Sequence, residues 1–208
     1  MNRRQALKSI GVAAALPLSS SELFALGRAA HAHLQAAAEG HDRYIFQSLD
    51  PEQGEILAVA CELIVPETDT PGARSARVPE FIDAILTGWF DDAERNRFLR
   101  GIRDLDKRAR VSSGAGFPSC AQAEQVRVLQ EMEAEALRDL EVLAPTRKAR
   151  RAAVSAPGAP FFSVLKWLTL YGYYTSESGM ERELEHIDFP GTYEGCTSLP
   201  SLPGVRGR

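Results

Sequence analysis

The segment 161–174 has almost no polar face, and it constrains the fold more than any other part of the chain. Its apolar and aromatic residues are Phe161, Phe162, Val164, Leu165, Trp167, Leu168, Leu170, Tyr171, Tyr173 and Tyr174. A helix that is apolar all round has to be enclosed on all sides. It is therefore either the central helix of a bundle, which the composition favours, or one side of a large protein interface. The three tyrosines favour the interface, because tyrosine is common where an apolar body meets a polar rim.

Helical periodicity also predicts the elements before this segment. Asp50-Pro51 is typical of an N-cap followed by proline in the first turn, and Val78-Pro79 begins a second helix. The later apolar stripes comprise Phe81, Ile82, Ile85, Leu86, Trp89 and Phe90, then Phe98, Leu99, Ile102 and Leu105, then Val126, Leu129, Met132, Ala136, Leu140 and Leu143. A Gly- and Ser-rich loop separates the last two stripes between Ser112 and Pro118. No strand-like alternation competes, so we expect an all-α protein, a single irregular bundle of about five to six helices.

The chain is predicted to divide into three parts. Residues 1–32 have the character of a signal peptide, residues 33–186 form the helical domain, and residues 187–208 form an extended C-terminal tail. Prolines and glycines recur throughout that tail and exclude a helix there. About 175 residues remain after the signal, which is enough for one domain with a hydrophobic core.

The N-terminus resembles a twin-arginine export signal. Arg3-Arg4 is followed by Leu7-Lys8 and a short apolar run over residues 10–18, although Ala6 stands where such signals commonly carry phenylalanine. The alternative is a membrane anchor, which needs roughly 20 apolar residues. Pro17 and the serines at 19–21 end this run well short of that length. We therefore expect Arg3 and Arg4 to be read by the twin-arginine translocase, a route that carries folded cargo.

The signal peptide has two candidate cleavage sites, and its removal changes the net charge of the chain. Ala30-His31-Ala32 and Ala25-Leu26-Gly27 are both small-residue sites, so the mature start is left open. Removing residues 1–32 takes away four basic residues and one acidic residue, so the net charge falls by three, from −4 to −7. Such an acidic body is a poor binder of nucleic acid. The basic run at 147–151 is interpreted as a solvated linker, with a patch for phosphate or an acidic partner as the alternative.

The body of the chain offers little chemistry of its own. His186 is the only histidine clearly beyond the signal region, and no His/Cys spacing resembles a zinc, haem or iron–sulfur site. No phosphate loop, dinucleotide fingerprint or nucleophile elbow occurs. The loop Glu67–Ala73 is best explained by Asp69 and the threonines capping backbone N–H groups while Pro71-Gly72 turns the chain. We expect no catalytic, cofactor or metal site in this chain, and hence a cofactor that belongs to a partner exported with it.

Three signatures together resemble the gluconate 2-dehydrogenase subunit 3 family. The first is Ile64-Val65-Pro66-Glu67-Thr68-Asp69-Thr70-Pro71-Gly72-Ala73 with Val78-Pro79-Glu80-Phe81-Ile82-Asp83. The second is Leu165-Lys166 with Leu168-Thr169-Leu170-Tyr171-Gly172-Tyr173-Tyr174-Thr175-Ser176-Glu177-Ser178-Gly179. The third is Pro190-Gly191-Thr192-Tyr193-Glu194-Gly195-Cys196. They run in order over nearly the whole mature chain.

The resemblance implies a non-catalytic small subunit of a periplasmic dehydrogenase that acts on a sugar or sugar acid. The catalytic partner in that family is a glucose-methanol-choline-type flavoprotein with FAD, with or without an iron–sulfur cluster, and a multihaem cytochrome c often receives the electrons. The small subunit carries the export signal for the pair and is needed for the flavoprotein to mature. The complex can be held at the inner membrane through the cytochrome. Competing classes are a stand-alone enzyme and an independent exported helical binding protein without a flavoprotein partner.

Candidate contacts to that partner lie in the second and third signatures. They are Trp167, Tyr171, Gly172, Tyr174 and Tyr193, with Gly172 as a point of close helix approach. Of the three cysteines, Cys61 is expected to be a small buried hydrophobe and Cys120 a free thiol. Cys196 in the tail is left either as an intersubunit disulfide or as a free or internally paired thiol.

Overall fold

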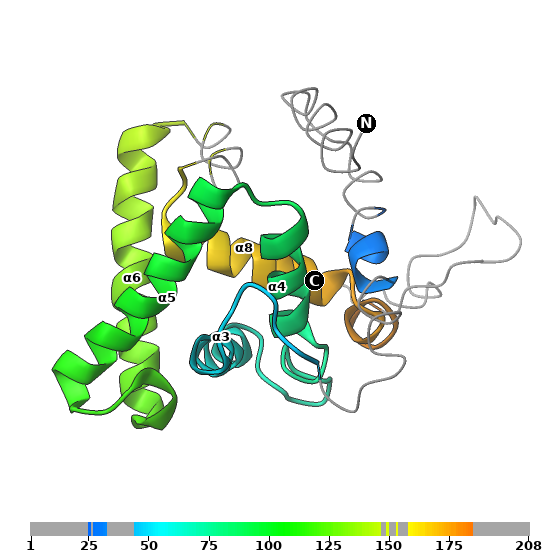
Figure 1. Cartoon of the computed structure of the whole chain (residues 1–208), viewed down its shortest axis with the longest axis horizontal. Helices are drawn as coiled ribbons and strands as arrows, with labels where there is room; N and C mark the ends of the chain where they lie inside the picture. The colour runs from blue at the N-terminus through cyan, green and yellow to red at the C-terminus, as the bar shows by residue number, and fades with distance from the viewer. Residues whose placement is uncertain are drawn as a thin grey trace, which may run out of the picture.

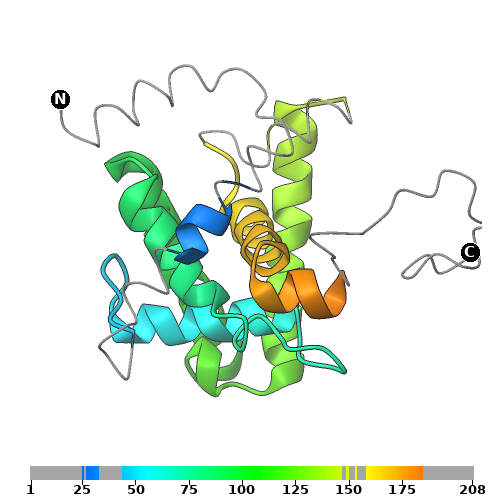
Figure 2. The ribbon, with the colours of Figure 1, turned by 90° about the vertical axis from the view of Figure 1, so that its right-hand side faces the viewer.

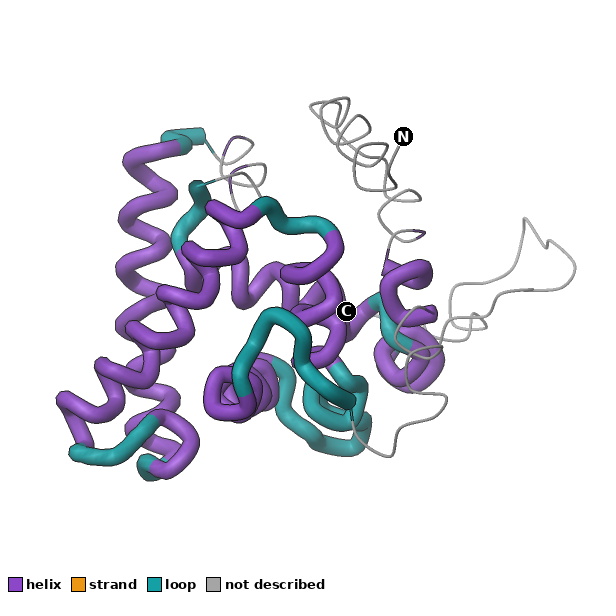
Figure 3. The backbone as a smooth tube through the Cα atoms, in the orientation of Figure 1, coloured by secondary structure: helices purple, strands orange, loops and turns teal. Residues whose placement is uncertain are grey.

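The computed structural model of the chain describes residues 44–146 and 158–184, together with residues 25, 27–32, 149 and 153. The described helices are α3 (Pro51–Ile64), α4 (Val78–Gly88), α5 (Asp92–Ser113), α6 (Gln122–Leu143) and α8 (Phe161–Tyr174). A 3-10 turn, η1 (Phe117–Ser119), precedes α6, and a π-helix, η2 (Ser178–Glu183), follows α8. Residues 27–32 are helical as well. No strand occurs in these ranges, so the predicted all-α fold is confirmed (Figure 3).

Helix α8 runs through the middle of the bundle. It contacts α3, α4, α5 and α6, and its C-terminal end leads into η2. The long helices α5 and α6 lie side by side as an antiparallel pair near one end of α8 (Figure 1). Figure 2 shows α8 almost along its axis, with the other helices around it. Of the two alternatives for residues 161–174, the structure shows the central helix of a bundle.

Two glycines allow neighbouring helices to approach α8 closely. A Cβ atom at Gly172 of α8 would lie 2.7 Å from Cδ1 of Phe81 on α4. A Cβ atom at Gly101 of α5 would overlap the ring of Phe161, the first residue of α8. Any larger residue would therefore push α4 or α5 outwards, which a close-packed core does not tolerate without cost.

The helix starts agree with the sequence signals. Asp50 caps α3 by accepting a hydrogen bond from the Gln53 N–H at 2.8 Å, and Pro51 occupies the first helical position. Asp91 caps α5 in the same way through the Glu94 N–H. Helix α5 ends at Gly114, whose positive φ of 78° forms the left-handed C-cap that glycine adopts without strain.

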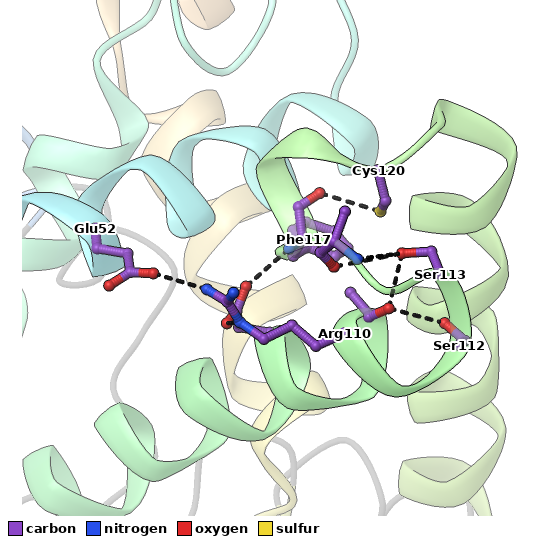
Figure 4. A network of polar contacts seen from close by, with 9 residues as sticks. Glu52, Arg110, Ser112, Ser113, Phe117 and Cys120 are labelled. Carbon is purple, nitrogen blue, oxygen red and sulfur yellow. Dashed lines mark hydrogen bonds and ion pairs between the residues drawn. The ribbon is translucent and has the colours of Figure 1, made fainter.

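The loop predicted between Ser112 and Pro118 is fixed by a polar network (Figure 4). The Asp106 carboxylate accepts a hydrogen bond from the Phe117 N–H at 2.8 Å and pairs with Arg110, which also reaches Glu52 of α3 at 3.0 Å. Phe117 itself is fully buried beneath the turn. The turn from α5 to α6 is thereby tied to α3.

Asp83 of α4 fixes the segment that leads into α3. Its side chain is completely buried, and its carboxylate accepts a hydrogen bond from the Tyr44 hydroxyl at 2.9 Å. Three backbone N–H groups, those of Gln47, Ser48 and Leu49, also donate to this carboxylate at 2.9–3.1 Å. A buried carboxylate with this many donors is well compensated for its loss of water. Asp83 belongs to the first of the three signatures, where its sequence context did not predict this anchoring role.

Candidate functional site

A groove lies on the surface where α4, α5 and α8 meet. Its volume is about 270 Å³. Helix α8 contributes Phe161, Val164, Trp167, Leu168 and Tyr171, and the remaining wall comprises Ile85, Trp89, Phe90, Glu94, Arg97, Phe98, Gly158 and Ala159. Most of these side chains are apolar or aromatic, while Glu94 and Arg97 supply charge. One side of the central helix is therefore only partly covered by the rest of the described chain.

Trp167 lines this groove and a second hollow beside it. Its ring stacks on Tyr171 with the centroids 5.1 Å apart and the planes at 14°. A second apolar hollow, of about 250 Å³, lies on the other side of Trp167, where Leu137 and Leu140 of α6 face Leu170. The Trp167 side chain thus forms a half-buried ridge between two hollows.

The structure separates the residues that the sequence grouped as partner contacts. Trp167 and Tyr171 line the groove together. Tyr174 is half-buried one turn further along, where its ring meets Tyr173 edge to face at 5.3 Å. Gly172 is buried on the side that faces α4, so the close helix approach expected there is made within this chain, with Phe81. Arg3, Arg4, Tyr193 and Cys196 lie outside the described residues.

Tyr171 in the groove and Tyr174 one turn further along both keep their protons at neutral pH. Burial raises the pKa of Tyr171 to about 12, against a hydrogen bond with the Gly27 backbone that lowers it. Burial also raises the pKa of Tyr174, and the nearby Glu183 adds to the effect. The phenol groups are therefore neutral, which suits them to an apolar contact surface with a polar tip.

The loop Glu67–Ala73 is held by a different carboxylate from the one expected. Glu62 of α3 accepts hydrogen bonds from the N–H groups of Glu67, at 2.8 Å, and Arg74, at 2.9 Å. Asp69 instead accepts from the Thr68 hydroxyl at 3.0 Å. The turn is docked on α8 by the Tyr173 hydroxyl, which donates to the Pro71 carbonyl at 2.8 Å. The loop thus joins α3 to α8, and its role here is structural.

The two described cysteines have the environments that were expected. Cys61 is completely buried, its Sγ lies 3.4 Å from the Thr169 hydroxyl, and burial raises its thiol pKa to about 12. Cys120 is half-buried, and its thiol donates to the Phe117 carbonyl at 3.3 Å. Both are free thiols.

The described residues contain no group of three or more His, Cys, Asp or Glu that could hold a metal ion. Within the same ranges, no helix is both long enough and apolar enough to cross a membrane. The groove has the chemistry of a contact surface, with aromatic rings around an apolar hollow and charge at two positions.

Comparison with known proteins identifies the family. The family model described as gluconate 2-dehydrogenase subunit 3 matches residues 51–191, a range that includes every helix from α3 to η2 and the groove between α4, α5 and α8. No curated protein and no solved structure gives a significant match. The match covers more than half of the sequence and contains the first two signatures in full. The chain belongs to the gluconate 2-dehydrogenase subunit 3 family.

Proposed function

We propose that this chain is a non-catalytic small subunit that binds, helps to mature and co-exports the catalytic subunit of a periplasmic sugar or sugar-acid dehydrogenase. The observation that carries the proposal is the apolar groove beside Trp167 and Tyr171 on the central helix. Family membership supports it, because the family is described as a subunit of gluconate 2-dehydrogenase. The partner is a glucose-methanol-choline-type flavoprotein that holds FAD, with or without an iron–sulfur cluster.

The composition of the groove favours a protein as its ligand. Aromatic residues carry much of the binding energy at protein interfaces, especially where they fill desolvated pockets. Trp167 lies between two hollows that a partner side chain can enter from either side. Glu94 and Arg97 place opposite charges beside the apolar floor, which is the arrangement of an interface rim around its core.

Co-purification with a glucose-methanol-choline-type flavoprotein tests the proposal. Trp167→Glu places a charge in the groove and is expected to reduce recovery of the complex at least tenfold, since loss of one anchor costs roughly 2 kcal/mol or more. Val142→Glu is the matched control, because Val142 of α6 is 84% exposed and lines neither hollow. Equal recovery of the two variants would contradict docking at this groove.

The same preparation decides between the competing classes. A chain that folds and is exported well without any flavoprotein is an independent helical binding protein. A flavin or haem absorption band in the purified chain alone identifies a stand-alone enzyme. In the proposed complex, the FAD band belongs to the flavoprotein, and a multihaem cytochrome c accepts the electrons and holds the complex at the inner membrane.

The export signal is tested by Arg3→Lys combined with Arg4→Lys. The twin-arginine translocase is proposed to read this pair, so the double variant should leave both the chain and the flavoprotein in the cytoplasm. Fractionation followed by a dehydrogenase assay measures the outcome. Wild-type activity in the periplasm of the double variant would refute a shared signal.

Cys196 is proposed to form a disulfide with the partner. An odd cysteine in an exported protein favours an intermolecular bond or a free thiol, and Cys61 and Cys120 are both free. Non-reducing electrophoresis of the complex should give one band at the summed mass, which separates on reduction and is missing in Cys196→Ser. Two separate bands from the unreduced wild type would exclude the bond.

A further inference from the structure

Residues 27–32 pack onto the helical domain, although the sequence analysis assigned them to the signal peptide. Gly27 and Ala30 are buried and His31 is half-buried, while Arg28, Ala29 and Ala32 are exposed. Positions 27, 30 and 31 share one face of a helix. Figure 2 shows this short helix, in blue, beside α8. The segment therefore presents one face to the domain and the other to solvent.

Specific contacts fix this helix in place. Nε2 of His31 lies 2.9 Å from the Gly172 carbonyl oxygen, and its ring stacks on Phe81 with centroids 4.7 Å apart. The Gly27 backbone forms a hydrogen bond with the Tyr171 hydroxyl. A Cβ atom at Gly27 would lie 2.6 Å from Cγ2 of Thr175, so a glycine is needed for the approach. We name the surface formed by Phe81, Tyr171, Gly172 and Thr175 the docking seat.

The docking seat is assembled only by folding. Phe81 comes from α4, and Tyr171 and Gly172 come from α8. Thr175 is the C-cap of α8. More than 85 residues of chain separate Phe81 from Tyr171. An unfolded chain therefore has no seat for residues 27–32, whereas a chain that folds before export has one.

Folding before export affects where the signal peptide, or export leader, can be cleaved. Cleavage after Ala32 would require the protease to bind Ala30 in an accessible segment, yet Ala30 is 0% exposed and lies in a helix. Proteolysis concentrates in exposed segments with few backbone hydrogen bonds. Ala25, in contrast, is exposed. Gly27 is buried in the same helix, so a cut after Gly27 meets the same obstacle. We infer that the export leader ends before Gly27, and that residues 27–32 remain on the exported domain as its N-terminal helix.

The inference rests on the proposed export of a folded chain, and the exported protein tests it directly. Intact-mass measurement of the periplasmic chain should give a mature N-terminus at Gly27 or earlier. The variant Ala32→Leu removes the small residue that a cut after position 32 needs, and since Ala32 is exposed it leaves packing unchanged. Processing should proceed as in the wild type. A mature N-terminus at Arg28 or later, or a block of processing in Ala32→Leu, would overturn the inference.

A matched pair tests the docking without reference to export. Ala30→Leu forces a larger side chain against the domain and should lower the melting temperature of the full-length chain by about 4–8 °C. Ala29→Leu makes the same change on the exposed side and should leave it within about 1 °C. His31→Ala is a milder variant should Ala30→Leu fail to fold. Equal melting temperatures for all three would show that the segment is not part of the domain, even if twin-arginine export is confirmed. If Ala30→Leu melts below Ala29→Leu as expected, but the chain is not exported, the export proposal is refuted and the docking of residues 27–32 still holds.

Discussion

The two sides of helix α8 have different surroundings. On one side, which we call the closed side, Leu165, Thr169 and Gly172 are buried against α3 and α4. On the open side, Val164, Trp167 and Tyr171 are half-buried along the groove. A hydrophobic segment therefore does not have to be wholly core or wholly interface. Its position is decided by which neighbours reach each side, and the same helix can serve both purposes.

Polar atoms distinguish the two sides as clearly as burial does. On the closed side, the Thr169 hydroxyl donates to the Leu165 carbonyl at 2.8 Å and contacts Cys61, so its polar group is satisfied within the fold. On the open side, aromatic rings stack on one another, and the Tyr171 hydroxyl is oriented by the Gly27 backbone. Substitutions on the closed side should affect folding, and those on the open side should affect association.

The largest effect is expected at Asp83, which anchors the helix that covers the closed side. Asp83→Ala leaves the Tyr44 hydroxyl and three backbone N–H groups without their acceptor, and should cost about 3–5 kcal/mol of unfolding free energy. Urea unfolding measures the loss. Asp69→Ala is the matched control, because Asp69 is exposed and accepts a hydrogen bond from the adjacent Thr68 hydroxyl, and it should cost less than about 0.5 kcal/mol. If both variants lost a similar amount of unfolding free energy, Asp83 would not be an anchor of the closed side.

Gly172→Leu should have the next largest effect. The first carbon of any side chain there already meets the Phe81 ring at 2.7 Å, so a leucine would separate α4 from α8 and cost about 3 kcal/mol. Gly88→Leu on α4 is the control, since a Cβ atom at Gly88 meets nothing within 4 Å. Thermal unfolding compares the two. If Gly172→Leu melts like Gly88→Leu while losing the partner, Gly172 belongs to the interface, as the sequence suggested.

Local signals in the sequence were sufficient to predict the main helices of the domain, α3, α4, α5, α6 and α8. Asp50-Pro51 and Val78-Pro79 mark starts that the structure confirms, because capping and proline placement depend only on neighbouring residues. The apolar stripe of 161–174 correctly indicated a helix that must be enclosed. It could not indicate which side stays open, because that depends on where α4, α5 and α6 end in space.

The features that were not predicted depend on which side chains the fold brings together, and two of them join residues far apart in the sequence. Asp83 holds a segment 34 to 39 positions away along the chain, and Glu62 holds a turn that begins after α3 has ended. His31 meets Gly172 across 141 positions. A small-residue pattern such as Ala30-His31-Ala32 suggests a cleavage site from local sequence alone, while its burial requires the folded domain. The hydrogen-bonding capacity of Asp83 in an otherwise apolar stripe was the one local sign of an anchor.

A smaller effect on stability should follow from Trp167→Ala. Because Trp167 is half-buried at the groove, its truncation should cost about 1–2 kcal/mol of unfolding free energy, less than for a core residue. Leu165→Ala on the closed side should cost about 2–5 kcal/mol, since Leu165 is 0% exposed. Binding to the flavoprotein should show the reverse order. A Trp167→Ala chain that is as unstable as Leu165→Ala would mean that the open side is core.

The smallest effect concerns His31, which meets the Gly172 carbonyl of the closed side and stacks on Phe81. The helix that carries His31 also reaches Tyr171 of the open side, through Gly27. Burial lowers the pKa of His31 below its ordinary value of 6.5, Arg77 lowers it further, and the hydrogen bond with the Gly172 carbonyl opposes both. Between the folded pKa and 6.5 the unfolded chain binds more protons than the folded chain, so stability is full above about pH 6.5 and is lost as the pH falls through that window. His31→Gln keeps a donor for Gly172 but does not titrate. Melting curves at about pH 7.5 and about pH 5.5 should therefore show a larger loss for the wild type than for His31→Gln. Because carboxylates elsewhere titrate equally in both chains, the difference between the two isolates His31. An equal loss would mean that the imidazole is as accessible to protons in the folded chain as in the unfolded one, and that residues 27–32 do not dock on the boundary between the two sides of α8.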